Sequence, residues 1–420
     1  MNPLQIMSEW HLDTSKPRVQ EILSSYSVED GVLDVMADLD LIVSICDLHP
    51  DVIRELRRYW VDHQPSTSVA AMILLVRGLV VEHAHPSEWL VNQEPYRDGE
   101  TERHAAVLSL LAIAAHQVRR FRKMNLDEQH ITFNLGHLKN YINNHYDSHG
   151  TIGSGNYTWC LYLASIGLIH LHTLHFMHHV FTDRCVLFRH RRSHRLIMLA
   201  LDGIEVRQDG QFEGVNDSHD YWFTTTYQET ETCYQGYRVN PYGAITDRVM
   251  ELNRSEYDVV LKPGDATIDY HIPTGPGYNL DDVKQSFREA VSFFSKLYPQ
   301  YDYRAFWCVS WLSSPQIPLF VSKQQGNIFQ INQQSYTFPA MHGQESILEF
   351  VFHDKHADIR TLQPTTTLEH DIVTYLLDGH TINCGIFLFP LEDLEAFGTS
   401  PYRSETDWQE FQSLQKNRTP

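Results

Sequence analysis

A glycine-rich turn joins an alternating segment to an amphipathic one, and its backbone could bind a phosphate group. Apolar and polar residues alternate over residues 266–272, which predicts a half-buried strand. Residues 273–279 (PTGPGYN) break this pattern, and apolar residues then recur at helical spacing over residues 280–297. The first N–H groups of a helix have no partner within it, and glycine lets a ligand approach them closely. The turn therefore predicts a phosphate cradle made of backbone groups.

Two features of the same turn oppose an anion. Pro276 has no N–H to donate, and Asp281 and Asp282 stand in the first turn of the predicted helix, where they would repel a phosphate. Tight turns between a strand and a helix are also common without a ligand. The alternative is therefore a purely structural turn, with Asn279 as the N-cap of the helix.

A second candidate is the histidine-rich segment over residues 168–179 (LIHLHTLHFMHH). On a helix, His172, His175 and His179 would share one face and could hold zinc. The sequence has no HExxH pattern and offers no evident fourth ligand, and apolar residues separate the histidines. We predict an amphipathic helix that is structural and binds no metal, with a His-liganded metalloenzyme as the alternative.

Composition limits the classes of protein to consider. With 420 residues and 42% hydrophobic content, the chain can bury a sizeable core in two or three domains. Acidic residues outnumber basic ones by 53 to 33, and a net charge of -20 opposes binding to nucleic acids and anionic membranes. The six cysteines are scattered, and the chain shows neither a signal peptide nor an apolar run long enough to span a membrane. We expect a cytoplasmic protein that acts on a small molecule.

The first part of the chain predicts helices. Apolar residues recur at spacings of three and four over residues 32–46, 52–60, 69–81 and 105–121. Residues 144–156 read as a loop, and residues 159–176 as one more helix. We expect a helical domain over residues 1–150.

The second part predicts strands with helices beside them. Strands are expected at residues 186–190 and 196–201 as a hairpin, and at 222–233, 305–312, 327–331, 346–352 and 385–389. Helices are expected at residues 249–259 and after the capping box formed by Thr366 and Glu369. The prediction is an α+β fold: a helical domain, then a mixed, mostly antiparallel sheet flanked by helices over residues 151–395, and a polar, frayed tail over residues 396–420.

Several short pieces resemble one protein family in order and spacing. They are Gly264-Asp265, His271-Ile272-Pro273, Ser286, Phe293-Phe294, Cys308, Ser310-Trp311-Leu312, Asn327-Ile328-Phe329, Thr367-Leu368, Leu376 and Gly379. On these pieces residues 185–389 resemble the bacterial acyltransferase-domain proteins. Those have a helical N-terminal domain and a C-terminal domain related to GNAT N-acyltransferases. The resemblance implies a GNAT-like fold in the second part of the chain.

The resemblance also implies a cosubstrate, acetyl-CoA or another acyl-CoA. In GNAT enzymes a turn with Gln or Arg followed by Gly-x-Gly binds the pyrophosphate of acyl-CoA. Here Gly275-Pro276-Gly277 matches the glycines, and Ile272 stands where that family has Gln or Arg. The cofactor-binding residues implied are Ile272, Thr274, Gly275, Gly277, Tyr278 and Asn279.

An acyltransferase also needs a base for the amine and a proton donor for the departing thiolate. His271 and Asp269 lie on the polar face of the strand before the turn, so we predict His271 as the base. Ser310 and Cys308 share a face of the strand over residues 305–312, and Ser310 is a further candidate. We predict Tyr336 as the acid.

The sequence thus predicts an acyl-CoA-dependent N-acyltransferase that acts on the amine of a small molecule or a protein. The alternative is a non-catalytic ligand-binding or interaction protein that retains the fold. One geometric expectation applies to both the acyltransferase and the non-catalytic protein. Residues 265–272 and 305–312 should be neighbouring parallel strands that splay apart near Pro273, with the helix from Leu280 packed on the sheet.

Overall fold

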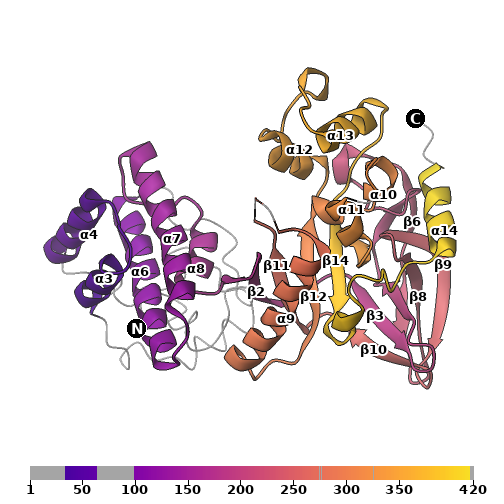
Figure 1. The fold of residues 1–420 in the computed structure, drawn as a ribbon, viewed down its shortest axis with the longest axis horizontal. Coiled ribbons are helices and arrows are strands. Elements are labelled where there is room, and N and C mark those ends of the chain that lie inside the picture. The colour runs from indigo at the N-terminus through magenta and orange to yellow at the C-terminus, as the bar shows by residue number, and fades with distance from the viewer. Residues whose placement is uncertain (1–33, 64–98, 274, 276, 325, 417–420) are drawn as a thin grey trace. The chain divides into compact units, whose positions relative to one another are not determined.

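The structure is a computed structural model that describes residues 34–63, 99–273, 275, 277–324 and 326–416 (Figure 1). Its contacts divide the chain into two compact units. The first comprises the described residues up to His170 together with Phe176–His178, and the second comprises Leu171–His175 and the described residues from His179 onward. Within these described ranges, no helix combines the length and the apolar character needed to cross a bilayer.

The first unit is built from helices, as predicted. They are α3 (Val35–Val43), α4 (Pro50–His63), α6 (Glu100–Lys123), α7 (Glu128–His149) and α8 (Tyr157–Ala164). The helices expected at residues 32–46, 52–60 and 105–121 are confirmed, and the one at 69–81 lies outside the described residues. The loop expected over residues 144–156 begins later, because α7 continues to His149 and ends where Gly150 adopts a φ of 65°.

The histidine-rich segment is not helical, so the helix predicted over residues 159–176 is wrong beyond α8. The segment forms two strands, β1 (Ile169–Leu171) and β2 (Leu174–Val180), joined at His172, whose φ is 55°. In β2 Leu174, Phe176 and His178 are almost fully buried on one face, with the period of two of a strand, and Met177 on the other face is 7% exposed. The face that would have gathered three histidines on a helix therefore does not form.

Most strands lie in the second unit, and β1 and β2 contain residues of both units. One has the order β1-β2-β11-β12-β14-β13, with β11 at Ala266–His271, β12 at Tyr303–Ser310, β13 at Tyr336–Pro339 and β14 at Gly385–Pro390. The other has the order β10-β3-β4-β8-β7, with β9 beside β8, and β5 (Glu205–Arg207) pairs with β6 (Tyr221–Thr224). Its strands are β3 (Cys185–His190), β4 (Leu196–Ala200), β7 (Tyr227–Glu229), β8 (Cys233–Asn240), β9 (Ala244–Asn253) and β10 (Tyr257–Leu261). Strands β11 and β12 are parallel, whereas β12 with β14, β14 with β13 and the pairs of the second sheet are antiparallel. The predicted α+β fold with a mixed, mostly antiparallel sheet is confirmed.

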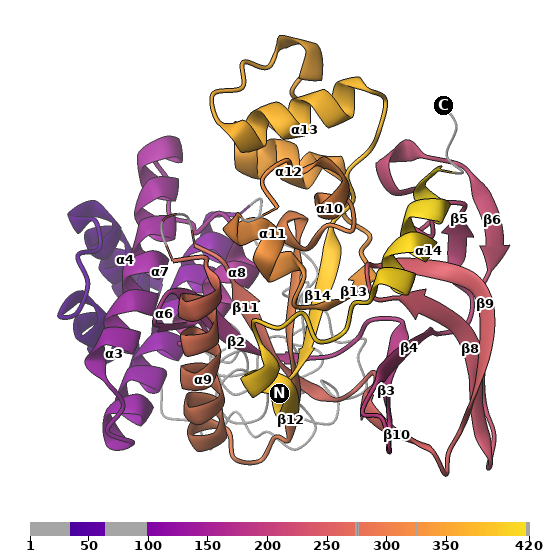
Figure 2. The ribbon, with the colours of Figure 1, turned by 45° about the vertical axis from the view of Figure 1, so that its right-hand side comes forward.

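The segment around the glycine turn has the predicted arrangement. Strand β11 pairs with β12 from Ala266 opposite Tyr303 as far as Asp269 opposite Trp307, and the pairing ends there although both strands continue. Helix α9 (Leu280–Leu297) packs on these strands, where the rings of Phe287 and Phe306 stack at 3.8 Å (Figure 2). The predicted neighbouring parallel strands are therefore confirmed, and their pairing ends at Asp269, earlier than the splaying predicted near Pro273.

Three other local predictions are wrong. Residues 327–331 and 346–352 are not strands but lie in α11 (Asn327–Asn332) and α12 (Gln344–Phe352). In α12 the residues that pack into the core, Ile347, Leu348 and Val351, are three and four positions apart, so helical burial outweighs strand propensity. Residues 249–259 are not a helix but the end of β9, a turn and the start of β10. In the turn, Asn253 accepts the N–H of Ser255 at 2.9 Å.

The remaining helices of the second unit come from the later part of the chain. Helices α10 (Ile317–Phe320) and α13 (Thr367–Leu377) join α11 and α12 in one apolar cluster, and α13 begins at the predicted capping box of Thr366 and Glu369. The tail predicted to fray instead contains α14 (Glu405–Lys416), which lies beside β8 (Figure 2). Its Phe411 is fully buried and its Asp407 binds Arg238, which explains why a polar segment stays folded.

Candidate functional site

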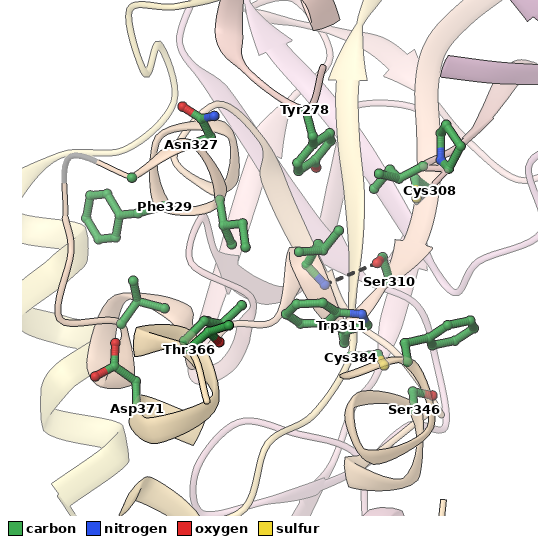
Figure 3. A pocket seen from close by; sticks show the side chains of 18 of the residues that line it. Tyr278, Cys308, Ser310, Trp311, Asn327, Phe329, Ser346, Thr366, Asp371 and Cys384 are labelled. Atoms are coloured by element: carbon green, nitrogen blue, oxygen red, sulfur yellow. Dashed lines mark hydrogen bonds between the residues drawn. The ribbon is translucent and has the colours of Figure 1, made fainter. Parts of the chain in front are cut away.

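A cavity of about 1140 Å³ opens where β11 and β12 separate. Its wall on the strand side comes from the ends of these two strands and the glycine turn, and its opposite wall comes from α11, α12 and α13. Figure 3 shows Cys308 and Ser310 on one side of this space and Asn327, Phe329, Thr366 and Asp371 on the other. Of the predicted site residues, His271, Ile272, Gly275, Gly277, Tyr278 and Ser310 line this cavity.

The glycine turn has a conformation that other residues rarely adopt. Gly275 and Gly277 have φ angles of 128° and 109°. A Cβ atom on Gly277 would lie 2.7 Å from Cγ2 of Thr173, whose hydroxyl donates to the Gly277 carbonyl at 3.2 Å. Thr173 belongs to the turn between β1 and β2, and its own N–H donates to Ser286 of α9 at 3.2 Å. The histidine-rich hairpin therefore supports the glycine turn rather than forming a site of its own.

The start of α9 follows the glycine turn directly. Asn279 caps the helix by accepting the N–H of Asp282 at 3.0 Å, as its predicted N-cap role requires, and it does not itself line the cavity. The Asp282 carboxylate is held by His172 at 3.0 Å and by the Asn279 amide at 2.6 Å. These hydrogen bonds, that of His172 first, lower the pKa of Asp282. The predicted cofactor residue Thr274 lies outside the described residues.

His271 stands at the end of β11 beside a buried carboxylate. Its Nε2 lies 3.2 Å from Oδ2 of Asp269, whose side chain is only 5% exposed. Burial lowers the pKa of His271, but the charge and hydrogen bond of Asp269 outweigh that effect and leave the pKa raised. Such a pair orients an imidazole and makes it a stronger base.

Tyr278 contributes a neutral hydroxyl to the cavity. Burial first, and then the neighbouring Cys308 thiol, raise the pKa of Tyr278, while the Tyr270 hydroxyl acts in the opposite direction. Burial also raises the pKa of Cys308 far above its ordinary value, so this thiol stays protonated and is a poor nucleophile. Both groups therefore stay protonated, and the hydroxyl of Tyr278 can donate a hydrogen bond; Tyr278 was predicted only as a cofactor contact.

Ser310 and Tyr336 differ in their surroundings. Ser310 lines the cavity, where its hydroxyl accepts the N–H of Leu312 at 3.1 Å (Figure 3). Tyr336 is fully buried in the apolar core, where its hydroxyl donates to the Val239 carbonyl at 2.6 Å and accepts from Met198 at 3.3 Å. Tyr336 does not line the cavity, so we do not carry it forward as the acid.

Sequence reasoning missed the wall made by the later helices. Lys323 is exposed at the cavity and Asp371 accepts hydrogen bonds from the backbone and hydroxyl of Ser322 at 2.9 and 2.7 Å. Phe329 and Leu368 add apolar surface. The capping box marked where α13 begins, but no local signal shows that its first turn faces β12. In the part of the chain that the structure describes, no three His, Cys, Asp or Glu side chains gather in a way that could hold a metal ion.

Comparison with known protein families found one match. A model of the family described as the GNAT-like C-terminal domain matches residues 168–387. No curated protein matches the chain. A crystal structure of an acyltransferase in complex with decanoyl-CoA is 18% identical, with 93% of this chain and 100% of that chain covered and a TM-score of 0.49. An acyltransferase in complex with decanoyl-CoA and teicoplanin is 16% identical over the same shares, also with a TM-score of 0.49. A likeness of this degree says nothing about the ligands of this chain.

Proposed function

The chain belongs to the family of GNAT-like C-terminal domains, and from this premise we propose that it is an acyl-CoA-dependent N-acyltransferase. The family match over residues 168–387 confirms the resemblance that the sequence suggested for its second part. The observation that carries the proposal is the end of β11–β12 pairing at Asp269 and Trp307, where a cavity opens beside a glycine turn and a helix start. A thioester could enter this gap while its phosphates stay at the turn.

In the proposal the pyrophosphate of acyl-CoA meets the N–H groups from Gly277 to Leu280. The first N–H groups of a helix lack acceptors within it, and Asn279 satisfies only that of Asp282. Lys323, exposed at the same cavity, supplies a cation for a phosphate. The apolar side chains of Phe329 and Leu368 would then face the acyl chain.

The chemistry assigned to the site is transfer of an acyl group from sulfur to nitrogen. The amine nitrogen attacks the thioester carbonyl carbon, a C–N bond forms, and the C–S bond breaks with its electron pair leaving on sulfur. His271, oriented by Asp269, accepts the proton of the amine. The hydroxyl of Tyr278 donates a hydrogen bond to the departing thiolate, and the proton that His271 accepted reaches the sulfur through solvent, so the products are an amide and the CoA thiol. Ser310 lines the gap but already accepts a backbone N–H, so we assign it a positioning role.

A second candidate function keeps the fold without the chemistry. Ile272 stands where the related enzymes have Gln or Arg, and Asp281 is exposed in the first turn of α9, near where phosphates would bind. Both features favour a non-catalytic binding protein with a different, less anionic ligand.

Calorimetric titration of the full chain with acetyl-CoA and decanoyl-CoA distinguishes these functions. We expect at least one of them to bind, and at 100 times its Kd to stabilise the fold by about 2.7 kcal/mol in a thermal unfolding experiment. Thiol release in the presence of a panel of primary amines, measured with a chromogenic disulfide, then tests turnover. If neither thioester binds, the result would favour the non-catalytic binding function.

A further inference from the structure

A second cavity, of about 520 Å³, lies next to the first one. Its walls come from β12, β13 and β14 on one side and from β5 and the residues just before β3 on the other. Phe212, Phe338 and Ile386 make its floor apolar, and Met341, 68% exposed, stands at its mouth.

The two cavities meet at the end of β12. Val309 and His342 line both of them. Trp307 lines only the second cavity, and Cys308 and Ser310 only the first, as the alternation of a strand requires. A molecule in the second cavity therefore approaches the splayed gap from the opposite face of the sheet.

The second cavity is acidic where the first is not. Asp183, Glu205 and Glu213 line it, against the single guanidinium of Arg184, which donates to the Asp202 carbonyl. Glu213 is already engaged by His219, at 3.2 Å, and by the N–H of Asp220.

Among the three carboxylates of the second cavity, that of Asp183 is half-buried and forms a hydrogen bond only with a neutral group. It accepts the indole N–H of Trp307 at 2.5 Å, and in the described part of the chain no Lys, Arg or His pairs with it. Burial raises the pKa of Asp183 to about 6, the indole opposes this, and the charge of Asp269 adds to it. A desolvated carboxylate of this kind gains from a cation placed beside it.

We propose that the second cavity binds the acceptor, and that the acceptor carries a protonated amine, recognised by Asp183, on an apolar body. The inference rests on the proposed function and adds the class of the acceptor and its route to the thioester. The cation gives up one proton to solvent before it attacks, so the transfer balances as written for the neutral amine. A cavity of this size with an apolar floor and few polar groups is typical of sites for small organic molecules.

The experiment compares phenethylamine with 2-phenylethanol, which has the same apolar body without the charge. Binding of each to the full chain is measured by calorimetry without acyl-CoA. We expect phenethylamine to bind roughly tenfold more tightly, and Asp183→Asn to remove that preference while leaving the alcohol unaffected. Asp247→Asn, an exposed carboxylate on β9 outside both cavities, is the matched control and should change nothing.

A second variant tests whether the probes bind in the second cavity, and it leaves the charge of Asp183 unchanged. Met341→Trp adds bulk at the exposed mouth and should weaken both probes, and leave the Kd of decanoyl-CoA within about twofold. Unchanged binding of the probes in Met341→Trp, or equal binding of amine and alcohol by the wild type, would overturn the inference. These outcomes are independent of acyl-CoA, so they are distinct from a failure of acyl-CoA to bind, which would overturn the proposed function instead.

Discussion

The two cavities that meet at the end of β12 present opposite chemistry to a ligand. The first offers the glycine turn, the neutral hydroxyl of Tyr278 and the cation of Lys323. The second offers three carboxylates above an apolar floor. One strand separates them, with Cys308 and Ser310 on one face and Trp307 on the other.

Under the two proposals, one sheet would bring an anionic and a cationic substrate together. Each ligand would meet complementary charge on its own face, and each would be disfavoured on the other face by repulsion. The pairing gap of β11 and β12 is then the place where their reacting atoms meet. Variants on either face should affect one ligand and spare the other.

The largest effect should come from Gly277→Asp. The φ of 109° disfavours any side chain, a Cβ atom would collide with Thr173, and the new charge would oppose phosphate. We expect acyl-CoA affinity to fall by a factor of roughly 100 or more, measured by calorimetry.

Gly264→Asp is the control for this variant. Gly264 precedes β11 with a φ of 95°, and its Cβ position is open, so the substitution introduces similar backbone strain far from the turn. Equal loss of affinity in both variants would show that backbone strain, not phosphate binding, explains the result.

His271→Ala should reduce turnover rather than affinity. Removing a general base costs about 100- to 10,000-fold in kcat, whereas the Kd of decanoyl-CoA should change by less than about threefold. Steady-state thiol release and calorimetry measure the two quantities separately. A change in Kd as large as the change in kcat would assign His271 to binding instead.

The pH dependence sharpens this assignment. His271 must be neutral to accept a proton, and Asp269 raises its pKa, so activity should fall as the pH drops through a value above 6.5. Asp269→Asn removes the raising charge, so the acidic limb of the kcat/KM profile should move to lower pH. An acidic limb that stays in place would show that another group titrates.

The turn around Gly277 could be predicted from the sequence because each of its signals is local. Alternation, a Gly-Pro break and a capping Asn279 each act within a few residues, and tertiary contacts agreed with them. The strand predictions for residues 327–331 and 346–352 were wrong because a short apolar run fits a strand or a helix equally well. Only the packing of the apolar cluster around Ile347 selects the helix. Asp183 and Glu213 line the same cavity only because the chain folds them together, and their spacing in the sequence does not predict this.

Asp183→Asn should change stability in a pH-dependent way. A carboxyl whose pKa is raised from 3.8 to about 6 on folding costs little below pH 3.8; its cost grows as the pH rises from 3.8 to about 6 and stays constant above that. Asn retains an acceptor for Trp307, so the variant should raise Tm by roughly 2–4 °C at pH 7.5 and by less at pH 4.5. The same increase at both pH values would mean that Asp183 ionises normally in the folded chain.

The smallest effect should come from Lys323→Ala at the first cavity. This side chain is exposed, so its attraction to a phosphate is weakened by water and by salt. We expect the Kd of decanoyl-CoA to rise about three- to fivefold in 50 mM salt, and the difference from the wild type to shrink at 500 mM, because counterions screen an exposed pair. Phenethylamine binding should not change, because Lys323 does not line the second cavity. If removing this cation increased the affinity for phenethylamine, the two faces would not be electrostatically independent. Strand β12 would then separate the two cavities by shape but not by charge.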